Sequence, residues 1–293
     1  MSRRGWLLFG AMCVIWGIPY LLIRVAVREL APVTLVFLRT TIGALLLTPV
    51  AAYRGELRPL LRHWRPLLAY TAVEVAIPWV LLARAETKLT SSLTGLLIAA
   101  VPLVGAVIVT LTGERERLGG RRWIGLLVGI VGVAAIVGLN LGQIDVVALV
   151  EIGFVAVGYA VGPIILSRSM TDLPAYGVVA ASLLLTGIVY APFAAANWPT
   201  KLPSAHVVES VLGLAVICTA LAFLVFFALI AEVGPVRATV ITYINPAVAA
   251  ALGVTLLHEH LTTGMVIGFA LVLAGCVLAT GRDRQGLEAV AEP

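Results

Sequence analysis

Three charged side chains stand inside long apolar stretches of the sequence: Arg39, Glu74 and Glu151. A charge at the centre of a bilayer costs about 2.5–3.5 kcal/mol on insertion scales, so such residues face a partner or a water-filled cavity. Helical rise places Arg39 and Glu151 about 10 and 9 Å from the same end of their stretches, which allows an Arg39–Glu151 ion pair. Glu74 lies about 12 Å from its end, near the middle, and is the better candidate for a binding site.

Two chemical roles fit these carboxylates. A carboxyl group in apolar surroundings favours its neutral form, which suits proton coupling, and the candidates for that role are Glu74 and Glu151. Alternatively, the carboxylate stays ionised and binds a cationic or amine-bearing molecule. A static Arg–Glu pair that only locks helix packing is the structural alternative, and the sequence leaves all three open.

Aromatic residues and one amide at comparable depth extend the candidate site. Rings with a polar atom can line a cavity and stack on organic ligands or amines, although each ring could equally pack helices together. Asn245 adds an amide, which needs a hydrogen-bond partner when it is buried. The predicted small-molecule binding residues are Trp16, Tyr20, Arg39, Glu74, Trp79, Tyr159, Tyr243 and Asn245.

Prolines interrupt four of the apolar stretches. An internal proline leaves the carbonyl one turn earlier without its hydrogen-bond donor and bends the helix. Such points can act as hinges or can be tolerated kinks. The hinge candidates are Pro19, Pro102, Pro163 and Pro246.

The composition predicts membrane-spanning helices that can hold these residues. The chain is 61% hydrophobic and only 12% charged, whereas soluble domains are nearer half apolar and a quarter charged. A helix needs about 20 residues to cross the hydrocarbon layer. The first stretch is interpreted as a retained span, because no small-residue cleavage site of a signal peptide follows it. We predict an all-α membrane protein with ten transmembrane helices, at about 6–23, 32–52, 66–83, 91–112, 123–139, 146–167, 175–196, 208–230, 236–257 and 264–281.

The Lys and Arg residues are distributed unevenly over the connecting loops. With the N-terminus in the cytoplasm, fourteen of the 20 fall on the cytoplasmic side, five fall on the other side, and Arg39 lies within a span. Short loops rich in Lys and Arg stay in the cytoplasm, so we predict a multi-pass protein of the cell membrane with both termini cytoplasmic. The net charge of +5 is therefore a topology signal, since a nucleic-acid partner would require a basic face on a soluble domain.

The sequence repeats itself at long range. Residues 116–125 read ERLGGRRWIG, and residues 259–268 read EHLTTGMVIG, 143 residues later. Pro19 and Arg24 recur as Pro163 and Arg168 at an offset of 144. Each copy holds five spans, an odd number, so the second copy crosses the membrane inverted, as in many secondary transporters. We predict two inverted five-helix repeats over 1–140 and 141–281, followed by a short cytoplasmic tail over 282–293.

The sequence resembles the drug/metabolite transporter superfamily, and within it the EamA-type carriers. The resemblance covers essentially the whole chain and implies a ten-helix carrier with a central cavity that moves small metabolites or drugs, often outward. It also implies that Trp16 and Gly17 lie at that cavity. Characterised members of the family export amino acids or other metabolites, or carry nucleotide sugars. The residues that carry it are Trp16-Gly17, Arg39, the segment ARAETKLTSSLTGLLIAAVP at 83–102, the segment 116–132, and Pro246, Glu259, Leu261, Gly268 and Gly275.

The leading functional hypothesis is a secondary active transporter for a small metabolite such as an amino acid, an amine or a drug-like molecule. We expect an exporter that works by alternating access. A sugar or nucleotide-type exchanger of the same fold and a channel-like facilitator remain as alternatives. The predicted partners are the small-molecule substrate, the lipid bilayer and, as one option, protons as the coupling ion. A monomer and a homodimer are both compatible with the sequence.

Several other chemistries lack their motifs. No G-x-x-x-x-G-K-[ST] loop is present for ATP hydrolysis. His258 and His260 are too close in sequence to share a helix face as zinc ligands. Cys13, Cys218 and Cys276 lack metal-binding spacing. Because no catalytic constellation is present either, we expect no enzyme activity, no catalytic residue, no metal and no cofactor.

Overall fold

The computed structural model describes residues 1–112, 119–138 and 145–280, with the side chains of residues 235 and 236 excepted. These residues form helices and connecting turns without any strand. Ten helical segments are long and apolar enough to cross a membrane, which confirms the prediction of an all-α membrane protein with ten spans. They are Arg3–Ala26, Pro32–Tyr53, Arg58–Ala85, Ser91–Leu111, Gly120–Gly138, Val146–Ser169, Ala175–Ala196, Ala205–Val233, Thr239–Leu257 and Thr263–Thr280.

Several spans consist of two or more shorter helices. The first five contain α1 (Arg3–Ile15) and α2 (Pro19–Ala26); α3 (Pro32–Tyr53); η1 (Arg58–His63), α4 (Trp64–Tyr70), η2 (Thr71–Ala76) and α5 (Ile77–Ala85); α6 (Ser91–Ile98) and α7 (Val101–Leu111); and α8 (Gly120–Gly138). The last five contain α9 (Val146–Ser169); α10 (Ala175–Ala196); α11 (Ala205–Leu212), η3 (Gly213–Leu221) and α12 (Ala222–Val233); η4 (Thr239–Tyr243) and α14 (Asn245–Leu257); and α15 (Thr263–Thr280). The short helix α13 (Pro235–Ala238) precedes the ninth span.

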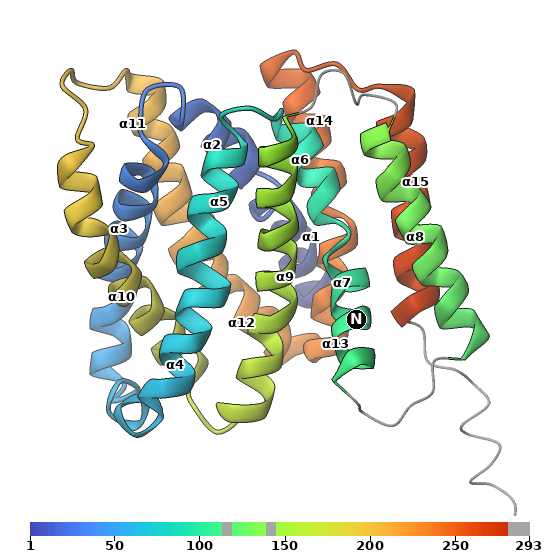
Figure 1. Cartoon of the computed structure of the whole chain (residues 1–293). Helices are drawn as coiled ribbons and strands as arrows, with labels where there is room; N and C mark the ends of the chain where they lie inside the picture. Colours follow the sequence, from blue (N-terminus) through green and yellow to red (C-terminus); the bar gives the residue numbers. More distant parts are fainter. Residues whose placement is uncertain (113–118, 139–144, 281–293) are drawn as a thin grey trace, which may run out of the picture.

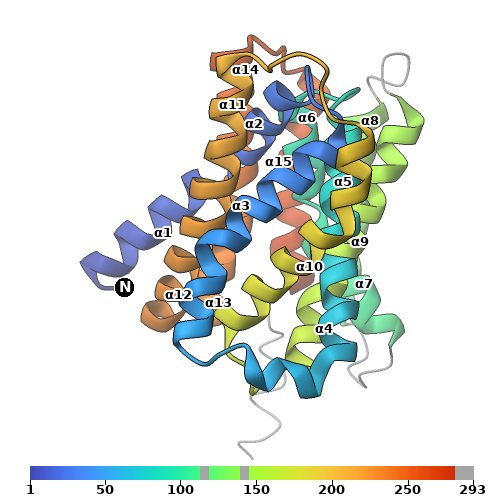
Figure 2. The same cartoon turned by 90° about the vertical axis from the view of Figure 1, so that its left-hand side faces the viewer.

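The helices stand side by side in one bundle whose turns gather at two ends (Figure 1, Figure 2). The upper end in Figure 1 carries the turns from α2 to α3, α5 to α6, α10 to α11 and α14 to α15. The lower end carries the connections from α3 to α4 and from α9 to α10. Side chains such as Phe154 and Ile188 project from the bundle with 62% and 61% of their surface exposed. Such an apolar surface fits a lipid environment, where apolar side chains need no cover.

The helix interruptions follow the prolines in three of the four predicted places. Pro19 begins α2 after the break at residues 16–18, Pro102 lies at the start of α7, and Pro246 lies at the start of α14. A proline is tolerated in the first turn of a helix, where its missing N–H would be unpaired anyway. Pro163, in contrast, lies inside the continuous helix α9. Whether any of the four acts as a hinge stays a prediction.

Two π-helical segments, η2 in the third span and η3 in the eighth, occupy corresponding positions along their spans. The breaks at Pro102 and Pro246 are separated by 144 residues, the same offset as in the Pro/Arg pairs of the sequence. Local backbone irregularities therefore recur at the spacing of the predicted repeat. Two residues of the repeated sequence motif, Glu116 and Leu118, lie outside the described residues, as does the predicted tail over 282–293.

Glycines allow α8 and α15 to pack backbone against backbone. A Cβ added at Gly132 would lie 2.6 Å from Val272 N and 2.7 Å from Gly268 O. A Cβ at Gly275 would lie 2.6 Å from Gly125 O. Small residues at such a contact let the helix axes approach closely. These glycines of α8 and α15 therefore serve helix packing within the chain.

Candidate functional site

A buried polar cluster lies between α3, α5 and η3, with Arg39 at its centre. Arg39 is 7% exposed, and its Nε donates a hydrogen bond to Thr219 Oγ1 at 2.9 Å. Its guanidinium carbon lies 3.7 Å from the ring centroid of Trp79. A cation over an aromatic face gains about 0.5–2 kcal/mol, more when water is excluded. The Arg39 charge is therefore held by a hydroxyl and an aromatic ring.

The π-helical segment η3 orients the hydroxyl that receives Arg39. Thr219 Oγ1 donates to the carbonyl of Leu214, five residues earlier, at 2.8 Å. Because its hydrogen is used in this bond, the hydroxyl oxygen presents lone pairs to Arg39. π-helical turns of this kind occur frequently at functional sites.

Two tyrosines extend the cluster from α2 and α9. Tyr20 and Trp79 belong to one buried cluster of side chains, and Tyr159 packs against that cluster. Tyr20 is 7% exposed and interacts electrostatically with both Arg39 and Tyr159. The structure thus brings together four of the predicted binding residues around one cation.

Glu74 lies beside this group in η2. It interacts electrostatically with Tyr159, and its Oε2 is buried without a hydrogen-bond partner among the described residues. The carboxylate rests against the backbone of α9, because a Cβ added at Gly162 would collide with Glu74 Oε2. Glu74 therefore joins the central cluster, here defined as Tyr20, Arg39, Glu74, Trp79, Tyr159 and Thr219.

The Arg39–Glu151 ion pair that the sequence allowed does not form in the structure. Glu151 accepts a hydrogen bond from Arg84 Nε at 2.8 Å, and Arg39 has the partners Thr219 and Trp79 described above. The Glu151 side chain of α9 therefore points toward α5, which carries Arg84. The Arg84 side chain is 59% exposed, so this pair is at the edge of the bundle.

Three predicted binding residues lie outside the central cluster. Trp16 packs on Phe223 and Phe226, with ring centroids 6.2 and 4.7 Å apart. Tyr243 Oη lies 3.1 Å from Thr280 Oγ1. Asn245 packs against Gly17 through its backbone: its carbonyl oxygen lies 3.0 Å from the position that a Cβ on Gly17 would occupy. Trp16 and Asn245 therefore flank one helix contact, between the first and ninth spans.

Glu86 and Thr219 are site residues that sequence reasoning missed. Glu86 is completely buried directly after α5, and neither carboxylate oxygen has a hydrogen-bond partner in the described part of the chain. Arg24 Nη1 donates to the Glu86 backbone carbonyl. The available signal was an acid in a short connection between two apolar spans. Thr219 offered no signal, because a threonine within an apolar span is common.

Glu259 caps a helix of the other half of the chain. Its Oε1 accepts from Ser91 N at 2.8 Å, and its Oε2 accepts from Ser92 N at 2.9 Å and from Ser92 Oγ at 2.5 Å. Ser91 and Ser92 begin α6, so the carboxylate satisfies N–H groups that have no partner within the helix. A negative charge is also favourable at the positive end of the helix dipole. This contact closes the upper end between the α14–α15 turn and α6.

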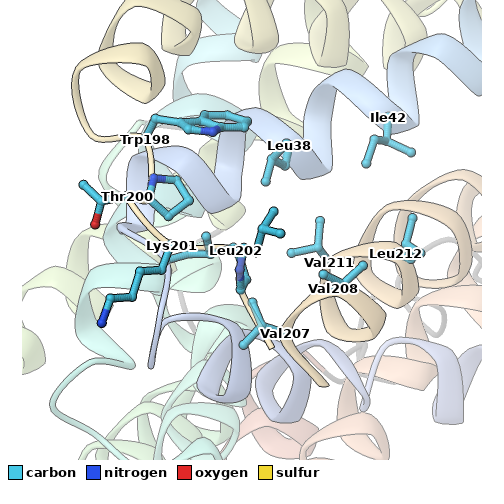
Figure 3. Close-up of a pocket in the computed structure, with 13 residues that line it drawn as sticks. Leu38, Ile42, Trp198, Thr200, Lys201, Leu202, Val207, Val208, Val211 and Leu212 are labelled. Atoms are coloured by element: carbon cyan, nitrogen blue, oxygen red, sulfur yellow. The ribbon is translucent and has the colours of Figure 1, made fainter. Parts of the chain in front are cut away.

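Two apolar grooves lie away from the central cluster. One, of about 380 Å³, lies between α3, α11 and residues 198–203, with Trp198 and Lys201 at its rim (Figure 3). The other, of about 420 Å³, lies between α3 and α10. Neither lining includes a member of the central cluster. Within the described ranges, no group of three His, Cys, Asp or Glu residues could hold a metal ion.

Ten apolar helices around a buried cation, a carboxylate and aromatic rings define a polytopic membrane protein with a polar interior. The chain matches the EamA-like transporter family over residues 3–138 and 150–281. It belongs to that family of ten-helix transporters.

Relatives in bacteria and archaea align with this chain over nearly its whole length. The Bacillus subtilis (strain 168) uncharacterized transporter YvbV is 25% identical over 97% of this chain and 93% of its own length. The Escherichia coli (strain K12) uncharacterized inner membrane transporter YedA is 30% identical over 93% of this chain and 90% of its own length. A crystal structure superposes with a TM-score of 0.67 at 20% identity over 100% of both chains, which supports the fold.

Proposed function

We propose that this chain is a secondary carrier that exports a small metabolite of the amino-acid, amine or drug-like class. The central cluster is the observation that carries this proposal. Arg39 offers a cation for an anionic group, and Tyr20, Trp79 and Tyr159 offer rings. Glu74 offers a carboxylate for an amine, and its Oε2 has no hydrogen-bond partner among the described residues. A few convergent polar groups among apolar and aromatic side chains are typical of small-molecule sites.

The proposed mechanism is alternating access between two inverted halves, residues 1–140 and 141–281. The central cluster contains members of both: Arg39, Glu74 and Trp79 come from the first, and Tyr159 and Thr219 from the second. Rocking of one half against the other would therefore separate Arg39 from Thr219 and open the cluster to one side in turn. The interruptions at Pro102 and Pro246, one in each half, supply places where the helices can bend.

Substrate exchange tests the carrier mechanism. A thermal-shift screen of the purified protein with amino acids, amines, organic cations, sugars and nucleotides selects a ligand. Counterflow of that labelled ligand is then measured in proteoliposomes. We expect saturable counterflow, and a loss of about tenfold or more for Arg39→Ala, because a charge-assisted contact of about 1.5–3 kcal/mol disappears.

The matched control for this experiment is Lys201→Ala. Lys201 is also a cation, but it lies at the rim of the groove in Figure 3, whose lining contains no member of the central cluster. It should retain counterflow. Flux that does not saturate would support a channel-like facilitator instead, and a response to sugars or nucleotides alone would support an exchanger for those compounds.

Glu74 is proposed as the residue that binds either a proton or the amine of the substrate. An ionised carboxylate without donors in apolar surroundings is costly, so the site favours a bound proton or cation. Transport by Glu74→Gln is measured in vesicles with and without a pH gradient. If Glu74→Gln still exchanges substrate but no longer responds to the pH gradient, Glu74 couples transport to protons. If its gradient-driven flux is unchanged, Glu74 has no part in the mechanism.

The proposed orientation puts both chain termini in the cytoplasm and the upper end outside. Leu202 and Tyr53 are 98% and 95% exposed. Leu202 lies in the connection from α10 to α11 at the upper end, and Tyr53 is the last residue of α3 at the lower end. A membrane-impermeant maleimide applied to intact cells should label Leu202→Cys and leave Tyr53→Cys unlabelled until the membrane is permeabilised. The reverse pattern would invert the topology.

A further inference from the structure

Glu86 is a carboxylate enclosed at the upper end of the bundle without a partner for either oxygen. The residue follows Ala85, the last residue of the third span, and is 0% exposed. Neither Oε1 nor Oε2 accepts a hydrogen bond from the described part of the protein. Because a buried ionised carboxylate needs donors, such a group remains stable by binding a proton or a cation. The proposed transport mechanism leaves Glu86 without a role.

Charged and titratable groups face Glu86 from several elements. Arg24 Nη1 donates to the backbone carbonyl of Glu86, so this guanidinium lies near the carboxylate without a hydrogen bond to it. Glu259, held by Ser91 and Ser92, adds a negative charge from the α14–α15 turn. The groups that interact electrostatically with Glu86 are Tyr20 and Arg24 of α2, Arg39 of α3, Tyr159 of α9, and Glu259.

Burial has a definite effect on this carboxyl group. It raises the pKa of Glu86 well above the usual range of a glutamate, and the charge of Arg24 acts in the opposite direction. A closed end that buries Glu86 therefore binds a proton more tightly than an open end in which water reaches the carboxylate. Proton binding and closure of the upper end are linked, so each favours the other.

We propose that Glu86 is a proton-binding site of the upper end, occupied when this end is closed and vacated when it opens to water. On opening, the carboxyl O–H bond breaks and the proton passes to water, while Arg24 stays as the counter-charge of the carboxylate. The inference rests on the alternating access proposed above. It places a second titratable site at the upper end, separate from Glu74 in the middle of the bundle.

Thiol accessibility tests the linkage directly. Thr94 of α6 is fully buried and its hydroxyl has no partner among the described residues, so Thr94→Cys loses no hydrogen bond. The three native cysteines are replaced by alanine, and the full chain is placed in nanodiscs. The labelling rate with a maleimide is measured between pH 5 and 8.5 and divided by that of Leu202→Cys, an exposed reporter that corrects for thiol ionisation.

We expect the normalised labelling rate of Thr94→Cys to rise with pH. The limit is about tenfold for each unit by which closure raises the pKa of Glu86. Glu86→Gln, which resembles the protonated acid in shape and charge, should stay slow at every pH. Glu86→Asp should retain the pH response. A Thr94→Cys reporter that labels at no pH, or that responds equally in Glu86→Gln, overturns the proposal.

Thermal unfolding of the same proteins gives an independent measurement. Because the folded-state pKa of Glu86 is raised, its contribution to stability is present at low pH and is lost as pH rises toward that pKa. Glu86→Gln should therefore flatten the fall of the unfolding midpoint with rising pH. The control is Glu29→Gln at the same end, since hydrogen bonds donated by Ser204 hold the pKa of Glu29 below its ordinary value.

Glu29→Gln should lose stability at neutral pH and lose little at low pH, because a lowered pKa stabilises only where the group is ionised. An unchanged pH profile in Glu86→Gln would contradict the proposed proton site. Counterflow distinguishes failure of the proposed carrier function from failure of the proton site. If the protein is not a carrier, no ligand shows counterflow, whatever the pH response of Thr94→Cys labelling.

Discussion

The Glu259 carboxylate, in the turn after α14, accepts the backbone N–H of Ser92 at 2.9 Å and caps α6 from the other half of the chain. The contact joins two helices that each belong to an interrupted span, α6 before Pro102 and α14 after Pro246. In the second copy of the repeated sequence motif, the acid Glu259 is therefore an interhelical cap. In the proposed mechanism, this cap must break whenever the upper end opens.

Removing the cap should destabilise the closed end. Helix caps contribute about 0.5–2 kcal/mol, so we expect Glu259→Ala to lower the thermal unfolding midpoint measurably and Glu259→Gln to lower it less. Glu259→Ala combined with Ser92→Ala should cost less than the sum of the single variants, since both remove one contact. Strict additivity in this double-mutant cycle would show that the two side chains act independently.

A methyl group at Gly162 should displace Glu74 from its position. The Cβ of Gly162→Ala would collide with the Glu74 carboxylate, so we expect transport or ligand binding to fall by about tenfold, equivalent to about 1.4 kcal/mol. Gly153→Ala is the control on the same helix, because a Cβ there meets nothing within 4 Å. Equal effects of the two variants would mean that α9 is sensitive to alanine in general, whatever lies beside it.

The close contact between α8 and α15 should tolerate no added atom. Gly132→Ala would bring a Cβ within 2.7 Å of backbone atoms of α15, and overpacking of this kind costs about 1–3 kcal/mol. We expect a lower unfolding midpoint in a thermal melt of the detergent-solubilised protein. Gly138→Ala should leave the midpoint close to that of the wild type, because a Cβ at Gly138 on the same helix meets no atom of the described residues within 4 Å. A neutral Gly132→Ala would show that the two helices can separate without cost.

Glu151 should be dispensable for transport. Its partner Arg84 is 59% exposed, and ion pairs at such an exposed site contribute about 0–1 kcal/mol. We expect Glu151→Gln to retain gradient-driven flux in vesicles, in contrast to Glu74→Gln. Abolished flux in a well-folded Glu151→Gln protein would restore Glu151 as a proton-coupling residue.

The ten spans were predictable because lipid imposes one simple requirement along the chain. About 20 apolar residues in a row mark a crossing, and this requirement does not depend on neighbours. Boundaries moved where polar residues continue a helix: the third span begins at Arg58 rather than at 66, since the short helices η1 and α4 lead into it.

Partners across the bundle were decided only by the tertiary structure. Depth along one helix is compatible with several neighbours, because the direction in which a side chain points depends on how its helix packs. Arg39 and Glu151 matched in depth, yet Arg39 meets Thr219 and Trp79 while Glu151 meets Arg84. Trp16 and Tyr20, four residues apart, are separated by the break before Pro19 and join different groups.

The sequence by itself determined which segments are long and apolar enough to cross a membrane, since hydrophobic transfer is a property of each segment. Burial of Glu86 could be decided only by the fold, because its surroundings come from four distant segments of the chain. Packing in three dimensions turned an acid in a short turn into an enclosed carboxylate that receives no hydrogen bond from the part of the chain that the structure describes.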